Sequence, residues 1–286
     1  MSIAVTGASG RLGSFVIDAL VERGVSPTDI VAITRTPEGV KFRDRAVTVR
    51  RADYDDPASL DLAFRGVERL LIVPGTEVGR RVVQHENVIA AAKRAWVGCI
   101  VYTSRLGAQL SDLRIAEEHR QTELALVRSG IPSTILRNGL HLDTYMERAP
   151  QHVERGEVVG GVGRVTAAHR RDHAEAAAAA IMTPWAGRVY ELGGPTFTLA
   201  EYAEELSRIS GEPVVFRRLE GDALREELIA RGVPGAQAAH EAELDAAISR
   251  GVLETDSAEF VQLIGHQPMS LREALREALA PKATAA

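Results

Sequence analysis

The chain opens on a short apolar segment that runs directly into glycines spaced by two residues each. Ile3–Thr6 precede Gly7, and Gly10 and Gly13 follow as an amphipathic helical pattern begins. A strand, a tight turn and a helix in this order direct backbone N–H groups at a phosphate, whose negative charge the helix dipole favours. The opening therefore predicts a dinucleotide pyrophosphate site. The alternative is a glycine turn without a ligand.

Each glycine has a separate reason to lack a side chain. Gly7 allows the tight turn, Gly10 lets the backbone approach the phosphates, and Gly13 lets the helix pack closely on the strand. The residues between and beside them are predicted to line the same cofactor site, namely Ser9, Arg11 and Leu12.

Composition limits the class of protein. The chain has 286 residues, 45% hydrophobic and 26% charged, which are ordinary values for a globular protein with a large core. The net charge of −5 argues against a general nucleic-acid surface, and no apolar run approaches the ~20 residues of a membrane span. Cys99 is the only cysteine, which excludes an internal disulfide. Because the predicted fold leaves no room for a signal peptide, we expect a cytoplasmic protein.

Short apolar segments alternate with helical patterns through the first half of the chain. Such alternation predicts a parallel sheet with helices on both faces, and nearly continuous Val- and Ile-rich segments are typical of buried parallel strands. The predicted strands are Ile3–Thr6, Ile30–Thr34, Val47–Asp53, Arg69–Val73, Cys99–Thr103, Ser133–Arg137 and Val189–Leu192. The predicted helices lie near Arg11–Arg23, Pro57–Arg65, Arg80–Ala95 and Asp112–Ser129. The fold class is therefore α/β: a Rossmann-type, doubly wound parallel sheet with a smaller, mostly helical C-terminal domain.

The end of the second predicted strand selects the dinucleotide. An NAD-preferring site has a carboxylate here for the ribose hydroxyls, whereas this chain has Arg35, which suits the extra 2′-phosphate of NADP. A charge-assisted hydrogen bond contributes about 1.5–3 kcal/mol, or about 10- to 100-fold in affinity. We therefore predict NADP(H) as the cofactor, with Arg11 also within reach of that phosphate. The alternative for both arginines is a solvated surface position.

Two further strand ends supply predicted cofactor contacts. Asp53 ends the third strand, where a side chain can accept from the adenine amino group, and the alternative is that it caps the following turn. Tyr54 follows it in the same predicted site. After the fourth strand, the small residues of Val73-Pro74-Gly75 let the backbone run alongside the second ribose and the nicotinamide.

The pattern changes after Arg137, and this change divides the chain. We predict an NADP-binding Rossmann domain over residues 1–138, completed by about 164–195, and a small substrate-binding or lid domain over 139–163 and 196–286. The later elements predicted are helices near His141–Arg155, Asp172–Met182 (capped by Asp172), Leu199–Ser210, Asp222–Arg231 and Gln237–Arg250, a glycine-rich turn at Gly156–Gly163 and a strand at Pro213–Leu219.

With these residues assembled, the chain resembles the NmrA-like group of atypical short-chain dehydrogenase/reductases. Within that group it is most similar to the type 2 NAD(P)H:quinone oxidoreductases and to their relatives, the triphenylmethane reductases. The likeness spans nearly the whole chain and is carried by Ile3–Gly10, Gln84–Ile89, Tyr102–Ser104, Leu136–Gly139, Val189–Leu192 and Leu263–His266. The resemblance implies an NADPH-binding Rossmann domain, a small C-terminal domain and a flat, oxidised substrate.

One expected feature of such enzymes is absent. Typical short-chain dehydrogenases carry a tyrosine acid and, four residues later, a lysine on the helix after the fifth strand. This chain has no lysine between Lys93 and Lys282, and alignment on Ser129–Pro132 puts Ile115 and His119 at the two positions. Ile115 cannot carry a proton, whereas His119 can hydrogen-bond a ribose or donate a proton near neutral pH. The alternative for His119 is a helix-surface histidine.

The absent acid constrains the substrate. Loss of a positioned general acid costs about 10²–10⁴ in rate, so reduction of an ordinary ketone to a basic alkoxide would be slow. A quinone instead gives a delocalised, weakly basic hydroquinone anion that takes its proton from water. The chain therefore favours quinones or cationic dyes over simple alcohols, with catalysis mainly by placement of the reactants.

Further candidates follow the later strands. Thr103 and Ser104 can bind the nicotinamide ribose or amide, or simply cap the strand end, and Asn138 can bind nicotinamide or substrate, or form a turn. His141 and Tyr145 lie one helical turn apart, so both can face the acceptor, and the alternative is a helix packing face. The residues predicted to be catalytic are His119, Asn138 and Tyr145.

Three other signals are discounted. His169 and His173 have the spacing of a zinc helix but lack the glutamate beside the first histidine, so we expect no metal. Cys99 lies in a predicted buried strand and is interpreted as core. The Asp55-Asp56 pair is interpreted as a helix cap.

These observations predict an NADPH-dependent oxidoreductase that transfers hydride to a quinone-type acceptor without flavin or metal. One alternative is an NmrA-like redox-sensing regulator that binds NADP without turnover. Another is a reductase of a triphenylmethane dye or other conjugated substrate. The expected partner is a small-molecule acceptor, with no nucleic acid and no membrane span.

Overall fold

The computed structural model describes residues 1–40, 42, 45–183 and 187–280. These residues divide into two compact units. Unit 1 comprises Met1–Asn138, Arg170–Leu192 and Ser257–Gln267, and unit 2 comprises Gly139–His169, Gly193–Asp256 and Pro268–Ala286. No helix of the described residues is long and apolar enough to cross a membrane.

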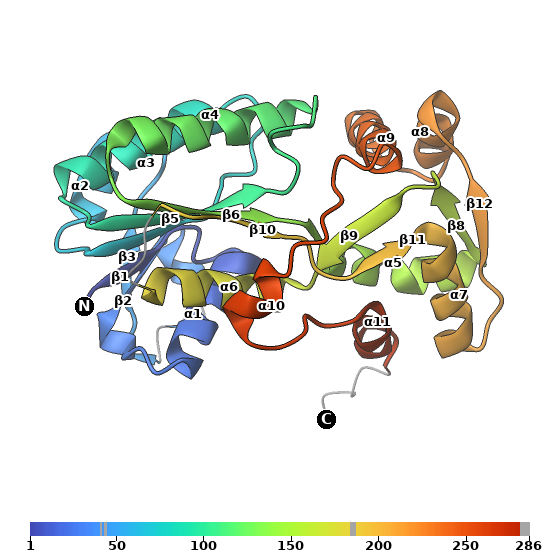
Figure 1. The fold of residues 1–286 in the computed structure, drawn as a ribbon, viewed down its shortest axis with the longest axis horizontal. Coiled ribbons are helices and arrows are strands. Elements are labelled where there is room, and N and C mark those ends of the chain that lie inside the picture. The colour runs from blue at the N-terminus through green and yellow to red at the C-terminus, as the bar shows by residue number, and fades with distance from the viewer. Residues whose placement is uncertain (41, 43–44, 184–186, 281–286) are drawn as a thin grey trace. The chain divides into compact units, whose positions relative to one another are not determined.

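Unit 1 is built on a seven-stranded sheet in which every neighbouring pair is parallel, in the order β10-β6-β5-β4-β1-β2-β3 (Figure 1). The strands are β1 Ile3–Val5, β2 Ile30–Thr34, β3 Thr48–Arg51, β4 Arg69–Ile72, β5 Cys99–Arg105, β6 Ser133–Asn138 and β10 Val189–Leu192. This arrangement confirms the predicted Rossmann-type sheet. The strand order reverses between β1 and β4, so ligands are expected beyond the carboxyl ends of the strands near this point.

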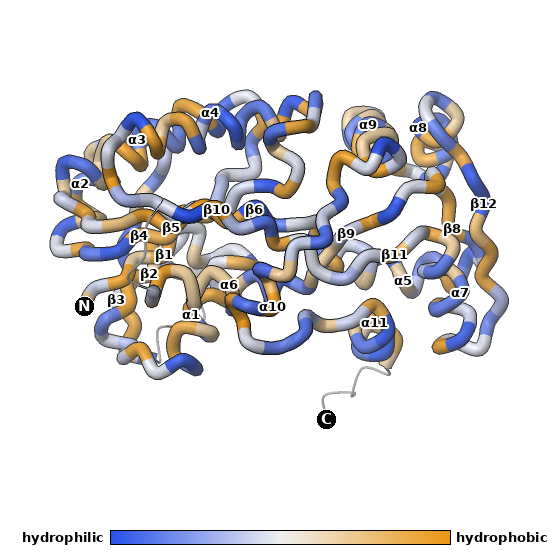
Figure 2. The backbone as a smooth tube through the Cα atoms, viewed as in Figure 1, coloured by the Kyte–Doolittle hydropathy of each residue, from blue (hydrophilic) through white to orange (hydrophobic). Residues whose placement is uncertain are grey.

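Helices cover both faces of this sheet. Figure 1 shows α2, α3 and α4 on one face and α1, α6 and α10 on the other. Their bounds are α1 Arg11–Glu22, α2 Pro57–Ala63, α3 Arg81–Arg94, α4 Arg114–Ser129, α6 Arg170–Met182 and α10 Glu259–Ile264, with short 3₁₀ turns at Pro27–Asp29 and Pro37–Gly39. The hydrophobic strands form the centre of the unit in Figure 2, because a parallel sheet covered on both faces buries both sides of each strand.

Unit 2 combines short strands with helices. Its strands are β7 Leu140–His141, β8 Glu157–Gly160, β9 Arg164–Ala168, β11 Thr196–Thr198 and β12 Val215–Arg218, and its helices are α5 Leu142–Arg155, α7 Leu199–Ser210, α8 Gly221–Ala230, α9 Gly235–Ser249 and α11 Leu271–Leu279. A three-stranded sheet has the order β11-β9-β7, and β12 pairs with β8. The core gathers residues from α5, α7 and α11, with Tyr202 and Leu275 fully buried.

Two local predictions are wrong. The predicted turn at Gly156–Gly163 contains β8, because Val158 is buried in the core and this segment pairs in register with β12. Helix α6 begins at Arg170 rather than after Asp172, which lies in its first turn, where the helix dipole favours an acidic side chain.

The unit boundaries also differ from the predicted domains. The segment that returns to unit 1 is Arg170–Leu192 rather than about 164–195, and β9 belongs to unit 2 because it pairs with β7 and β11. Residues 257–267 belong to unit 1, because α10 packs on α6 and β10. No helix was predicted at α10, and its short length gives little periodicity to detect.

Candidate cofactor site

The glycine turn has the geometry that a pyrophosphate site needs. Gly7 has φ +61°, a left-handed conformation that glycine adopts without a Cβ penalty. A Cβ on Gly13 would lie 2.4 Å from the carbonyl oxygen of Gly7, so only glycine lets α1 pack this closely on the turn. The first N–H groups of α1 therefore begin directly at the turn, where they have no intrahelical acceptor and can bind an anion.

The predicted 2′-phosphate contact lies just after β2. Arg35 is 65% exposed, and its Nη1 lies 3.8 Å from Oε1 of Glu77 in the loop after β4. Beside it, the Thr34 hydroxyl donates to Ser9 Oγ at 2.8 Å, which ties the end of β2 to the glycine turn. Arg11 is exposed at the first position of α1, and Leu12 is half-buried behind it. An exposed arginine of this kind can turn toward a phosphate at little cost.

Asp53 and Tyr54 have different local roles. Oδ1 of Asp53 accepts from the backbone N–H of Asp55 at 3.0 Å, so the carboxylate already caps its own turn. The Tyr54 hydroxyl donates to Thr6 Oγ1 at 2.5 Å and to the Val73 carbonyl at 2.8 Å, and burial raises its pKa. Tyr54 thus joins the carboxyl ends of β1 and β4.

Of the acidic pair after Tyr54, Asp56 caps a helix, as predicted, whereas Asp55 does not. Asp56 accepts from the backbone N–H groups of Ala58 and Ser59 at the start of α2. The preceding Asp55 accepts from Gln84 Nε2 at 3.0 Å and pairs with Arg80, also at 3.0 Å.

A buried ion pair stabilises the loop after β4 through hydrogen bonds to its backbone. Arg81 Nε and Nη2 donate to the Gly75 carbonyl at 3.0 and 2.9 Å, and Nη1 pairs with Glu118 of α4. Both side chains of the pair are buried. A Cβ on Gly75 would lie 2.8 Å from Gln84 Oε1, so a larger residue here would require the Gln84 amide to move. The backbone of Val73, Pro74 and Gly75 is therefore fixed where we predicted that it runs beside the cofactor.

His119 is buried, so the alternative of a surface histidine is wrong. Its Nδ1 lies 2.6 Å from the Tyr102 hydroxyl, and the nearby ring of His85 packs edge-on against Tyr102. Burial, followed by the charge of Arg81, holds the pKa of His119 well below its ordinary value. His119 is therefore a neutral imidazole near neutral pH, which corrects the expectation that it donates a proton there.

The fifth and sixth strands continue further than predicted. Thr103 and Ser104 lie within β5 rather than after it, and both are buried. The Thr103 hydroxyl donates to the Ile72 carbonyl at 3.3 Å, and the Ser104 hydroxyl donates to Glu123 at 2.6 Å. Neither hydroxyl is therefore available without rearrangement. Asn138 is the last residue of β6 rather than a turn residue, and its buried Oδ1 has no partner among the described residues.

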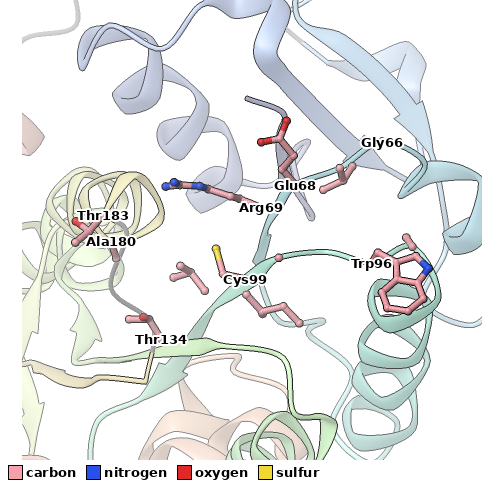
Figure 3. A pocket seen from close by; sticks show the side chains of 13 residues that line it. Gly66, Glu68, Arg69, Trp96, Cys99, Thr134, Ala180 and Thr183 are labelled. Atoms are coloured by element: carbon pink, nitrogen blue, oxygen red, sulfur yellow. The ribbon is translucent and has the colours of Figure 1, made fainter.

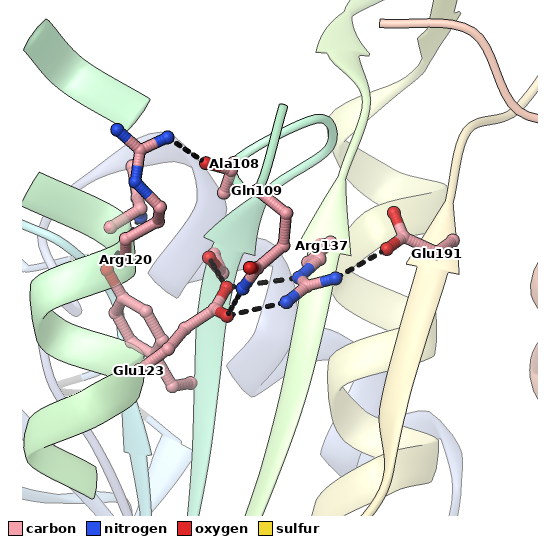
Figure 4. A network of polar contacts seen from close by, with 9 residues as sticks. Ala108, Gln109, Arg120, Glu123, Arg137 and Glu191 are labelled. Carbon is pink, nitrogen blue, oxygen red and sulfur yellow. Dashed lines mark hydrogen bonds and ion pairs between the residues drawn. The ribbon is translucent and has the colours of Figure 1, made fainter. Parts of the chain in front are cut away.

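A charged network that the sequence reasoning missed lies beside Ser104. Arg137 donates to both oxygens of Glu123, at 3.2 and 2.7 Å, and to Glu191 at 2.8 Å, which joins α4, β6 and β10 (Figure 4). Glu123 also accepts from Gln109 at 3.2 Å. The signal that was available is an arginine within an apolar strand, because a buried cation requires a carboxylate partner.

Unit 2 contains a cavity of about 780 Å³ that both His141 and Tyr145 line. The Tyr145 ring also packs edge-on against Phe197 and Tyr202, with centroids 5.4 and 5.8 Å apart. Tyr145 therefore packs in the core, as the packing alternative predicted, and that this pair faces the acceptor stays a prediction. Burial raises the pKa of its hydroxyl.

The two histidines with zinc-helix spacing and the single cysteine have contacts that differ from a metal site or a nucleophile. His169 lies 3.4 Å from Asp143, and His173 stacks on Phe260 with centroids 5.3 Å apart. Cys99 is only half-buried, so its assignment to the core is wrong. With Arg69 and Thr134 it lines a cavity of about 730 Å³ at the amino ends of the strands (Figure 3), away from the edge that binds ligands in such sheets.

The sheet, its strand-order reversal and the glycine turn define a Rossmann-type dinucleotide-binding protein. Residues 7–184 match the family described as NAD(P)H-binding. Quinone oxidoreductase 2 of Escherichia coli is 42% identical over 278 residues, which are 96% of this chain and 97% of the relative. The chain belongs to the NAD(P)H-binding, NmrA-like family of oxidoreductases.

Solved structures agree with this assignment. The NADPH-dependent quinone oxidoreductase of Escherichia coli, complexed with NADPH, superposes with a TM-score of 0.93 over 96% of this chain and 99% of that one, at 42% identity. The triphenylmethane reductase of Citrobacter sp., complexed with NADP(H), gives 0.92 over 97% and 100%, at 36% identity. The prediction of a nicotinamide dinucleotide cofactor is confirmed by family membership.

Proposed function

We propose that this protein is an NADPH-dependent oxidoreductase that transfers hydride to a quinone-type acceptor without a bound flavin or metal. The observation that carries the proposal is a combination. The chain is 42% identical to a quinone oxidoreductase over nearly its whole length. Where typical short-chain dehydrogenases have their acid and lysine, it has the half-buried Ile115 and the buried, neutral His119.

The preference for NADPH is proposed from Arg35. The glycine turn and α1 bind the pyrophosphate, and the Arg35 guanidinium, at the end of β2, pairs with the 2′-phosphate with help from Arg11. Glu77 is then displaced from Arg35, because a phosphate dianion competes well with one exposed carboxylate at 3.8 Å. Because Arg35 is 65% exposed, solvent screens its ion pair with the 2′-phosphate. We therefore expect a preference for NADPH over NADH near the lower end of about 10- to 100-fold.

The remaining contacts follow the carboxyl ends of the strands. Asp53 and Tyr54 lie toward the adenine, and the fixed backbone at 73–75 lies toward the second ribose. His119, as a neutral imidazole, can still hydrogen-bond a ribose. The unpartnered Oδ1 of Asn138 is a buried acceptor that suits the carboxamide N–H₂ of the nicotinamide. When bound, the cofactor supplies hydride from its dihydronicotinamide ring.

The acceptor class is proposed from the absence of a side-chain acid. His119 stays neutral near neutral pH, and burial raises the pKa of Tyr102 above its ordinary value, which makes this phenol a weaker acid. A quinone needs no proton from the protein at the moment of reduction, unlike a ketone. Unit 2 has a cavity of its own of about 780 Å³, lined by apolar side chains together with charged ones such as Arg148 and Glu241, and by Tyr145 and His141.

A turnover assay on the purified protein tests the proposal. NADPH oxidation is measured with a panel of benzoquinones and naphthoquinones, after removal of flavin and with a chelator present. We expect NADPH oxidation to continue both after flavin removal and in the presence of the chelator. Oxidation only with an added flavin or metal contradicts the cofactor statement. Turnover of triphenylmethane dyes but no quinone supports the second candidate, which the similarity to triphenylmethane reductase favours. Tight NADP(H) binding without any turnover indicates a regulator.

A further inference from the structure

A buried cation lies at the carboxyl end of β5. Arg105 is the last residue of that strand and pairs in register with Asn138, the last residue of β6. Nε and Nη2 of Arg105 and Oδ1 of Asn138 are buried, and the described residues offer none of the three a hydrogen-bond partner. Two neighbouring strand ends thus carry unused donors and an unused acceptor at the edge where ligands bind in this fold.

The neighbouring carboxylates are already engaged elsewhere. Ser104 and its register partner Arg137 share Glu123, whereas Arg105 and Asn138 occupy the next register position. Glu118 is paired with Arg81. Burial, followed by the charge of Arg81, lowers the pKa of Arg105 to about 10, so the guanidinium remains charged at neutral pH.

An unpaired buried charge is costly, since desolvation of an ion costs several kcal/mol unless a partner compensates it. Replacement by a hydrophobic residue of similar size would remove that cost. The arrangement is therefore best explained by a partner that arrives with the ligand. Arg105 as a whole is only half-buried, so a ligand at the strand end can reach it.

We propose that Arg105 is a catalytic residue whose guanidinium donates hydrogen bonds to the quinone oxygen that becomes anionic during reduction. This inference rests on the proposed function. Asn138, beside it, is the residue assigned above to the nicotinamide, which puts the cation next to the reacting carbon. Arg105 then takes the place of the missing tyrosine acid, stabilising the developing charge without giving up a proton.

The step balances without a further reactant. The acceptor gains a hydride with both electrons of the broken C–H bond and becomes a hydroquinone monoanion, while the nicotinamide is oxidised. Arg105 keeps all its protons throughout. Solvent then supplies the single proton that completes the hydroquinone.

Arg105→Met tests the assignment, because methionine keeps much of the side-chain length and removes the charge. Arg94→Met is the matched control, since Arg94 is an exposed arginine of α3 that pairs with Asp61. Removal of one oxyanion donor lowers kcat by about 10²–10³, so we expect a loss of that size in Arg105→Met and none in the control. The loss should be greater for quinones whose hydroquinone anions are more basic. Arg105→Lys, which keeps the charge, should retain part of the activity.

Two measurements do not depend on turnover. The melting temperature of the ligand-free protein should rise in Arg105→Met, because the unpaired charge is gone. Binding of hydroxynaphthoquinone, an anion at neutral pH, to the NADP⁺ complex should weaken about tenfold or more, in line with the loss of one charged hydrogen bond. NADP⁺ affinity should stay within about twofold of the wild type, a change of only about 0.4 kcal/mol.

The outcomes separate this inference from the proposed function. If the wild type reduces no quinone, the proposed function is wrong, whatever the variant does. If the wild type is active and Arg105→Met matches it in rate and in anion binding, the assignment of Arg105 is wrong. A lower melting temperature in Arg105→Met, with unchanged anion binding, would show a structural role instead.

Discussion

Two sets of buried polar groups lie near the carboxyl ends of the same strands, and they differ in one respect. On the face covered by α3 and α4, Arg81 pairs with Glu118, Arg137 with Glu123, and Tyr102 with His119. At the next register position, Arg105 and Asn138 have buried atoms for which the described part of the chain offers no partner. The first set is satisfied within the protein and positions the loops of the site. The second set is complete only with a ligand, which marks it as functional.

The largest effect should come from breaking the satisfied set. Glu123→Ala removes the acceptor of the buried Ser104 hydroxyl and leaves Arg137 with Glu191 as its remaining carboxylate partner. Removal of one partner of a buried ion pair costs about 3–5 kcal/mol, and because Arg137 keeps Glu191 we expect a loss near the lower end of that range in the free energy of unfolding. Urea denaturation measures it, with Glu117→Ala on the exposed side of α4 as the control. Equal stability of the two variants would show that the pair is not structural.

Acid should weaken the same region. Burial, followed by the charge of Arg81, lowers the pKa of His85 from 6.5 to about 3. Below pH 6.5 the unfolded state therefore binds more protons than the folded state, and the free energy of unfolding falls as the pH falls toward 3. This one group should cost about 2 kcal/mol at about pH 5.

Urea midpoints at neutral pH and at about pH 5 test this sign. His85→Gln should lose less stability on acidification than the wild type. His266→Gln is the control, because a hydrogen bond to Glu175 raises the pKa of His266 and gives its contribution the opposite sign. An unchanged acid slope in His85→Gln would mean that His85 titrates normally.

A methyl group added to the glycine turn tests whether this turn binds the cofactor. In Gly13→Ala, the new Cβ lies 2.4 Å from the Gly7 carbonyl oxygen, so α1 must move away from the turn. Overpacking of this kind costs about 1–3 kcal/mol, and NADPH affinity should fall with stability. Fluorescence titration of NADPH measures the affinity. Gly24→Ala is a control with nothing within 4 Å, although its φ of +86° adds some strain there. Equal affinities in the two variants would place the pyrophosphate elsewhere.

The smallest expected change is one of specificity. Arg35→Ala should weaken NADPH binding about tenfold and leave NADH binding unaltered, because only NADPH has the 2′-phosphate. Glu77→Gln should strengthen NADPH binding slightly, since it removes the carboxylate that faces Arg35. If Arg35→Ala keeps the full preference for NADPH, the phosphate pairs with another residue.

The sequence predicted unit 1 better than unit 2, for a physical reason. Long apolar strands and a glycine turn are local signals, so the seven strands and the start of α1 were found. The two-residue strand β7 and the three-residue strand β11 have too few residues to show a period. Strand β8 was predicted to be a turn because Gly156 precedes it and Gly160 is its last residue, although its valines make it β-prone.

The site residues show the same limit. The capping role of Asp56 could be predicted from its position before Pro57, and so could the place of Arg35 after β2, whose contact with the 2′-phosphate stays a prediction. Burial of His119 could not, because it depends on how α3 and α4 pack on β5. Arg105 was missed because we expected the fifth strand to end at Thr103, two residues earlier. An arginine at a strand end indicates a ligand site only when its buried nitrogens are seen to have no partner among the described residues, and that requires the structure.

The central claim is reduction of a quinone without a side-chain proton donor, and the pH dependence of kcat/KM for the quinone tests it most directly. Between about pH 6.5 and about pH 8, no group assigned to the reaction titrates, because burial holds the pKa of His119 well below its ordinary value and Arg105 stays charged. We predict a flat profile over this range. A fall of about tenfold per pH unit on the alkaline side, absent in His119→Gln, would show that a protonated His119 is the acid and would contradict the account.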